Sequence, residues 1–107
     1  MSNNFYKIIA TEPFLLNYIE FFEKYELEKF EKFKLRLKVY PYLGDQLRVP
    51  FVREFKTESG KRAYFLVYTE IKVILFVAFS TKKNQKKIIT DIFERLKEFK
   101  EFAYSMY

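Results

Sequence analysis

The sequence predicts an α+β domain in the order β-α-α-β-β-β-α, with an antiparallel sheet covered by helices on one face. The first observation is the run from Arg62 to Ser80, which is rich in Val, Ile, Phe and Tyr, as buried strands are. The second is that apolar residues recur at spacings of three and four before and after this run, as in amphipathic helices. At 107 residues, we expect one domain, residues 1–107, with its own core.

A strand and two helices are expected in the first forty residues. Residues 5–10 (FYKIIA) are an apolar run long enough for one strand. Thr11 is expected to cap a first helix, whose apolar positions continue to Tyr25. The pattern restarts at Glu26 and runs to about Val39, which predicts a second helix packed against the first as an antiparallel hairpin.

Three strands and a last helix are expected after the loop at 40–45 (YPYLGD), where a Pro and a Gly interrupt helical structure. Residues 47–57 form the first of these strands. Residues 62–69 and 72–80 are expected to pair as a hairpin, although no Gly supports the turn between them. A final amphipathic helix starts near Ile88.

Strand side chains alternate between the two faces of a sheet. On the strand that begins at Arg62, Phe65 is therefore expected on one face, whereas Arg62, Tyr64 and Tyr68 share the other. Because helices are expected over one face only, the second face is predicted to be open. Lys56 would lie on it beside Arg62.

Positive charge is concentrated in the C-terminal two-thirds of the chain. The net charge is +6, from 20 Lys and Arg against 14 Asp and Glu. Residues 1–33 contain four Lys and six Glu, a net charge of −2, whereas residues 34–107 have a net charge of +8. The densest block, residues 82–87 (KKNQKK), contains no acid. This distribution predicts an anionic partner for the C-terminal part.

The chain contains neither histidine nor cysteine. That excludes imidazole acid-base catalysis, thiol chemistry, disulfides and the usual transition-metal ligands, so catalysis would have to use Lys, Arg, Tyr or carboxylates. We expect no metal or other cofactor. The sequence has no signal-peptide pattern and no apolar run near 18 residues, which predicts a soluble cytoplasmic protein without a membrane partner.

The order of motifs resembles that of the RelE/ParE superfamily of type II toxin-antitoxin toxins, including its HigB-like branch. The matching pieces are PYLGDQLRVPF, VREFK, RAYFLVY and FSTKKNQKK, and the resemblance extends from about residue 5 to residue 99. It implies a ribosome-dependent mRNA endonuclease, or mRNA interferase, that an acidic antitoxin holds inactive. Such enzymes let a ribose 2′-hydroxyl attack the adjacent phosphate, and they use Lys, Arg and Tyr in place of His. The protein would be a monomer or part of a toxin-antitoxin hetero-oligomer.

The resemblance also assigns roles to individual residues. Lys56 resembles a basic residue on the family's second strand, and Arg62 is expected to replace the usual Arg, whose position Phe65 occupies. The expected catalytic residues are Lys56, Arg62, Lys82 and Lys83. The expected RNA-binding residues are Lys61, Tyr64, Tyr68, Gln85, Lys86 and Lys87, with the tyrosines stacking on bases or ribose.

Alternatives remain open at this point. The chain could be a non-catalytic relative on the same fold, either a gyrase poison or an inactive member that binds a protein or nucleic acid. It could also bind RNA by charge and stacking alone, with steep salt dependence and no cleavage. Tyr64 and Tyr68 could be half-buried strand residues, residues 82–87 could be a solvated helix start, and Glu54 and Glu70 are expected to form ion pairs.

Overall fold

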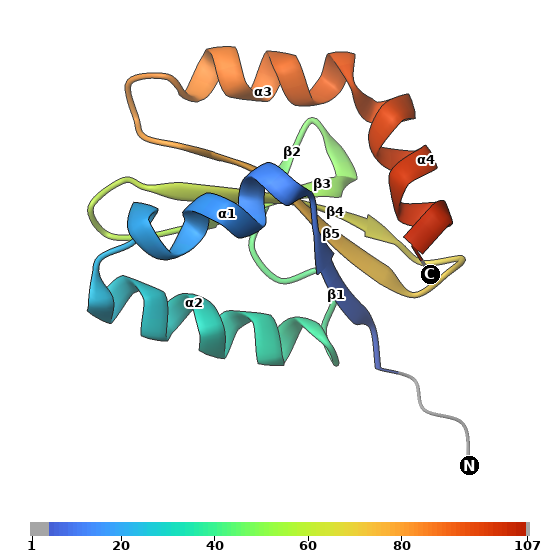
Figure 1. Ribbon diagram of the computed structural model, residues 1–107, viewed down its shortest axis with the longest axis horizontal. Helices are drawn as coiled ribbons and strands as arrows, with labels where there is room; N and C mark the ends of the chain where they lie inside the picture. The colour runs from blue at the N-terminus through green and yellow to red at the C-terminus, as the bar shows by residue number, and fades with distance from the viewer. Residues whose placement is uncertain (1–4, 107) are drawn as a thin grey trace.

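A computed structural model describes residues 5–106 as a five-stranded sheet with four helices in that range. The elements in chain order are β1 (Lys7–Ala10), α1 (Glu12–Phe21), α2 (Lys24–Leu37), β2 (Asp45–Leu47), β3 (Val49–Lys56), β4 (Arg62–Tyr68), β5 (Val73–Ser80), α3 (Gln85–Glu94) and α4 (Leu96–Met106) (Figure 1). The α+β class and the predicted element order are confirmed, with two additions. β2 is a short extra strand, and the last helix is divided in two at Arg95.

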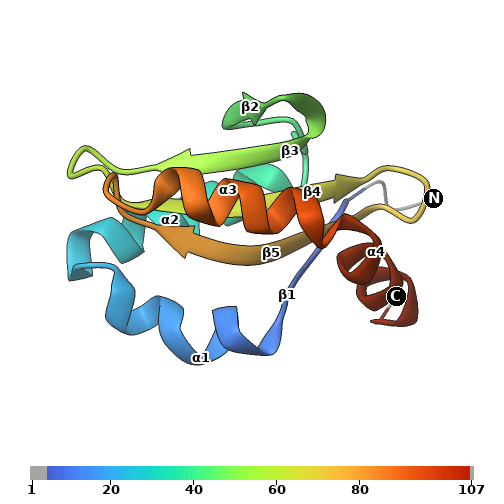
Figure 2. The ribbon, with the colours of Figure 1, turned by 90° about the horizontal axis from the view of Figure 1, so that it is seen from above.

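The strands lie in the order β1-β5-β4-β3-β2, which Figure 2 shows from above. β3, β4 and β5 form the predicted antiparallel meander. β1 joins the sheet as predicted, but it runs parallel to β5, so the sheet is mixed. No hairpin fixes the direction of β1, because two helices and three strands separate it from β5 in the chain.

Helices cover both faces of the sheet, which corrects the prediction of one covered face. Figure 1 shows α2 on one side of the sheet and α3 on the other. Phe30 of α2 packs with Phe65 and Phe76 on the first face, whereas Ile92 of α3 packs with Leu66 on the second. The second face needs this cover because it is mostly apolar, and every residue of β4 is buried as a result.

Aromatic side chains fill the core between α1, α2 and the sheet. Phe30 is fully buried, and its ring centroid lies 5.1 to 6.0 Å from those of four other buried phenylalanines. Centroid separations in this range are typical of attractive ring contacts. The high aromatic content therefore builds this core.

Candidate nucleic-acid interface

Cations gather where β3 ends, β4 begins and β5 leads into α3. In the sheet register Lys56 lies opposite Arg62, and directly opposed residues share a face. The Arg62 guanidinium donates a hydrogen bond from Nη1 to the Gly60 carbonyl, 2.8 Å away. A Cβ placed on Gly60 would lie 3.9 Å from the Cβ of Lys82. Lys56, Arg62 and Lys82 therefore meet around the β3–β4 turn, and we call this region the basic end.

The lysine block after β5 is exposed. Asn84 holds its first turn, because its Oδ1 accepts hydrogen bonds from the Thr81 backbone N–H, at 2.9 Å, and from the Thr81 hydroxyl. Lys82 and Lys83 lie in this turn before α3 begins. The side chains of Lys56, Lys82, Lys83, Lys86 and Lys87 are all exposed, and Gln85 is half-buried. These residues can reach an anionic partner.

Arg62 is not on an open face, which corrects that part of the prediction. It is only 5% exposed, and it forms a buried ion pair with Glu54, whose Oε2 lies 3.7 Å from Arg62 Nε. Arg62 Nε and Glu54 Oε1 have no hydrogen-bond partner. Burial raises the pKa of the Glu54 carboxyl, although the Arg62 charge opposes this change. The predicted ion pair of Glu54 is confirmed, whereas Glu70 accepts a hydrogen bond from Tyr104.

Tyr64 and Tyr68 are both buried, so neither ring can stack on an RNA base from these positions. The Tyr64 hydroxyl lies 2.7 Å from the Ser80 hydroxyl, and burial raises the pKa of Tyr64. Burial also raises the pKa of Tyr68, whose hydroxyl has no hydrogen-bond partner. Both rings are buried because α3 and α4 cover their face, so of the two interpretations left open the structure favours buried strand residues.

Lys61, predicted to bind RNA, also supports the structure on the side of α1 and α2. Its Nζ donates hydrogen bonds to the Phe21 carbonyl, at 2.8 Å, and to Glu26 Oε1, at 3.1 Å. Glu26 is buried and also accepts a hydrogen bond from the Ser59 hydroxyl. The lysine therefore ties the junction of the two helices to the β3–β4 turn.

Arg48 is a further cation beside α3 that the sequence patterns did not indicate, and it lies at the start of β3, at the other end of that strand from Lys56. A shallow groove of about 380 Å³ lies between β2 and α3, with Arg48 on one side and Lys86 on the other. The Arg48 guanidinium lies 4.7 Å from the centre of the Phe93 ring. Residues 47–57 were expected to be one strand, but Arg48 has a φ of 60° and separates β2 from β3. This turn could not be predicted from the sequence, because a positive φ in a tight hairpin is expected at glycine and not at arginine.

The described residues contain no group of acidic side chains that could hold a metal ion. Within residues 5–106, no helix is both long and apolar enough to cross a membrane.

Comparison with solved structures shows the relationship of the fold. The chain is 16% identical to the free state of a double arginine mutant of the E. coli toxin RelE, with a TM-score of 0.69 over 85% of this chain and 97% of that one. It has the RelE toxin fold.

Two further RelE structures support this assignment at the same 16% identity. The isolated toxin gives a TM-score of 0.61 over 81% of this chain and 98% of that one. The double arginine mutant in complex with a peptide of the antitoxin RelB gives a TM-score of 0.62 over 78% of this chain and 93% of that one. No protein-family model matches the sequence, and no curated protein matches it. The resemblance seen in the motifs is thus confirmed for the RelE-like fold.

Proposed function

We propose that this RelE-like protein is a type II toxin that cleaves messenger RNA at the basic end and is neutralised by an acidic antitoxin. The observation that carries the proposal is the meeting of Lys56, Arg62 and Lys82 around one turn. Clustered cations on one surface can bind successive RNA phosphates. The RelE fold supports the same chemistry, and a chain without histidine is compatible with it.

In the proposed reaction the ribose 2′-oxygen attacks the adjacent phosphorus, and the bond from phosphorus to the 5′-oxygen breaks. Lys56 Nζ accepts the 2′-hydroxyl proton as the general base. The Lys82 ammonium donates a proton to the leaving 5′-oxygen, so the products are a 2′,3′-cyclic phosphate and a 5′-hydroxyl. Both lysines are exposed and can reach a bound strand. The Lys82 ammonium and the charge that Lys56 gains with the proton favour the transition state, because negative charge builds up on the phosphate oxygens as it forms.

Arg62 is proposed to hold the non-bridging oxygens of the scissile phosphate. A guanidinium has five N–H donors in a planar fork. In the described contacts, Arg62 Nη1 donates a hydrogen bond to the Gly60 carbonyl, and Arg62 Nε forms the 3.7 Å ion pair with Glu54. A phosphate would therefore compete with Glu54 for this group. A phosphate forms charge-assisted bonds to a guanidinium as a carboxylate does. Because Arg62 is only 5% exposed, this contact requires its side chain to move out of the buried pair.

One observation favours a second function. Arg62 is buried, and Phe65 occupies the usual Arg position as part of the aromatic core. A chain in this arrangement could keep the fold and bind RNA by charge without cutting it. Binding would then fall steeply with salt, because each phosphate contact releases a counterion.

The two functions are separated by an RNA cleavage assay with and without ribosomes. We expect cleavage by the wild type, and a loss of turnover of roughly 10²- to 10³-fold in Arg62→Ala and Lys56→Ala with much weaker effects on RNA binding. The double variant Lys82→Ala/Lys83→Ala should also lose turnover. Lys97→Ala is the control, because this lysine is exposed on α4.

Arg62 is buried, so the folding of its variant is checked by urea unfolding, whereas Lys56 is exposed and its variant should fold normally. A wild type that binds RNA tightly but cuts none under either condition would reject the enzyme and favour the binding protein. Equal turnover in Lys56→Ala, Lys82→Ala/Lys83→Ala and Lys97→Ala would also reject the proposed site.

A further inference from the structure

A second concentration of positive charge lies in the second half of α2 and in the loop that follows it. Residues 24–31 contain two Lys and three Glu, a net charge of −1, whereas residues 32–44 contain three Lys, one Arg and no acid, a net charge of +4. A helix dipole favours cations only within the last turn of the helix. It therefore does not account for a segment of this length without acids.

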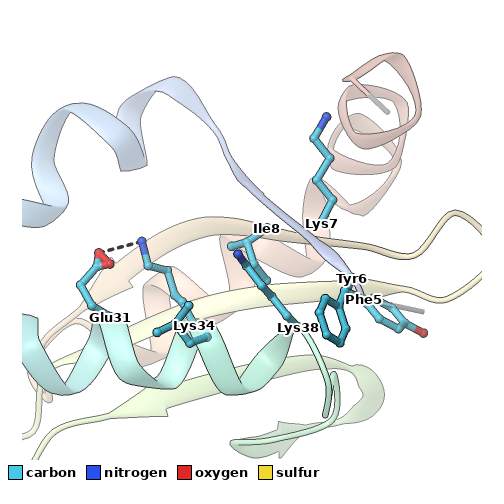
Figure 3. Close-up of a pocket in the computed structure, with 8 residues that line it drawn as sticks. Phe5, Tyr6, Lys7, Ile8, Glu31, Lys34 and Lys38 are labelled. Atoms are coloured by element: carbon cyan, nitrogen blue, oxygen red, sulfur yellow. Dashed lines mark ion pairs between the residues drawn. The ribbon is translucent and has the colours of Figure 1, made fainter. Parts of the chain in front are cut away.

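The four cations of this segment lie on two sides of α2. Lys34 and Lys38 line a groove of about 660 Å³ between β1 and α2, where Lys34 forms an ion pair with Glu31 at 2.8 Å (Figure 3). Lys32 and Arg36 are exposed and belong to none of the described ion pairs. They are four residues apart, so they are neighbours on one face of the helix, where like charges repel. An anionic ligand would relieve this repulsion.

Two exposed tyrosines follow Arg36 in the chain. Tyr40 is 62% exposed and Tyr42 is 46% exposed. Together with Arg36 they line an open groove of about 470 Å³ at the end of α2. Large aromatic side chains that are exposed together mark interaction sites. We call the surface formed by Lys32, Arg36, Tyr40 and Tyr42 the Tyr40 surface.

Arg53 of β3 holds the loop that presents these tyrosines. Its Nε donates a hydrogen bond to the Leu43 carbonyl at 3.1 Å, and its Nη2 donates one to the Gly44 carbonyl at 3.0 Å. The same guanidinium lies 5.5 Å from the centre of the Tyr42 ring. Because the backbone of the loop is already fixed, a ligand would not have to order it on binding.

The Tyr40 surface is remote from the basic end. α2 starts beside the β3–β4 turn, where Glu26 accepts a hydrogen bond from the Ser59 hydroxyl, and it runs away from this turn to Leu37 (Figure 1). With a rise of about 1.5 Å per residue, its 14 residues span about 20 Å. The two cationic surfaces are therefore separate.

Exposed rings beside cations are the combination that binds single-stranded nucleic acid. Bases stack on tyrosine rings, whereas Arg and Lys contact the phosphates. An acidic protein segment would neutralise the cations but has no bases to stack on the rings. A second copy of this chain is disfavoured as the occupant, because two-fold pairing would bring the same cationic patch of each copy together.

We propose that the Tyr40 surface is a second binding surface for single-stranded nucleic acid. Bases stack on Tyr40 and Tyr42, and the phosphates between them pair with Lys32 and Arg36. No bond is made or broken at this surface. The inference goes beyond the proposed function, because it concerns other residues than the basic end and stands whether or not the chain cuts RNA.

The test uses a fluorescently labelled single-stranded DNA of eight adenosine nucleotides, because DNA lacks the 2′-hydroxyl that the proposed cleavage needs. Binding is followed by fluorescence anisotropy in the full chain carrying Lys82→Ala/Lys83→Ala, which weakens competing contacts at the basic end. We expect Tyr40→Ala to weaken binding at least about fivefold, whereas Tyr40→Phe keeps the ring and should change it less than about twofold. Tyr25→Ala is the matched control, since Tyr25 is 56% exposed near the start of the same helix.

The contribution of charge is tested through the salt dependence of the same binding. Each phosphate contact to a single strand contributes about −0.7 to the slope of the logarithm of the binding constant against the logarithm of the salt concentration. Arg36→Ala should therefore weaken binding and make this slope shallower by about 0.7. Lys24→Ala should change neither quantity, because Lys24 is an exposed cation at the other end of α2.

Three results would overturn the proposal. One is equal DNA binding by Tyr40→Ala and Tyr25→Ala, or a salt slope that Arg36→Ala leaves unchanged. Another is binding of an acidic peptide that Tyr40→Ala and Arg36→Ala weaken while DNA binding stays intact, since the surface would then take a protein partner. The third is a dimer that Tyr40→Ala dissociates, which would assign the surface to a second copy. RNA cleavage at the basic end is measured with another nucleic acid and other variants, so the proposed function and this inference can fail separately.

Discussion

Glu26→Gln should weaken the connection between α2 and the β3–β4 turn. The Glu26 carboxylate is only 1% exposed, and it accepts hydrogen bonds from the Ser59 hydroxyl, from Lys61 Nζ at 3.1 Å and from the Glu23 backbone N–H at 2.9 Å. Burial alone would raise the pKa of Glu26. The bonds from Ser59, Glu23 and Lys61 outweigh burial and lower the pKa from 4.5 to about 2.

The size of the effect follows from this change in pKa. A pKa lowered from 4.5 to about 2 corresponds to about 3 kcal/mol of stability at neutral pH. The Lys61 side chain is 23% exposed, so solvent screening reduces the expected loss in Glu26→Gln to about 2 kcal/mol. Because the folded-state pKa is below the unfolded one, the contribution is complete above pH 4.5 and disappears as the pH falls toward about 2.

Urea unfolding of the wild type and Glu26→Gln, measured from about pH 7 down to about pH 2, checks this prediction. The difference in unfolding free energy should be largest near neutral pH and should shrink through the acid range. Glu20→Gln is the control, since Glu20 is exposed and takes part in none of the described ion pairs. A difference that stays constant across the whole range would refute the reasoning, because it would come from packing and not from the charge.

Three further predictions concern stability and use the same unfolding assay. Tyr68→Phe should raise the unfolding free energy by about 1 kcal/mol, because it removes a buried hydroxyl that has no hydrogen-bond partner. Tyr64→Phe should lower the unfolding free energy by about 1 kcal/mol, because it removes a hydroxyl that is hydrogen-bonded to Ser80. Equal effects of the two substitutions would contradict this prediction. Gly44→Ala should lower the unfolding free energy by more than about 2 kcal/mol, because the new Cβ would lie 2.4 Å from a β3 carbonyl oxygen. Gly60→Ala should lower it by only about 1 kcal/mol, because only the positive φ of this residue is strained. A larger loss for Gly60→Ala than for Gly44→Ala would reject this account. Phe30→Ala should cost about 3 to 5 kcal/mol, and a loss below about 1 kcal/mol would mean that this ring is not central to the core.

Local patterns in the sequence were sufficient to predict most elements and the meeting of the cations at the basic end. Alternation along β4 correctly placed Phe65 on the face opposite Tyr64, because strand side chains alternate whatever the surroundings. The order of three consecutive antiparallel strands then fixed which strand ends lie together. Lys56 and Lys82 could therefore be assigned to one end of the sheet from the strand order alone.

Other features depend on contacts between residues far apart in the chain. The burial of Arg62 and Tyr64 was decided by α3 and α4 folding over their face, and Lys61 was paired with Glu26, which is 35 residues away in sequence. The groove at β1 also exists only because β1 lies at the sheet edge beside α2. The sequence by itself determined the elements, the faces of each strand and the position of the charge, since these follow from short-range periodicity. Only the tertiary structure decided which faces of the strands are exposed to solvent, because burial depends on the packing of the whole chain.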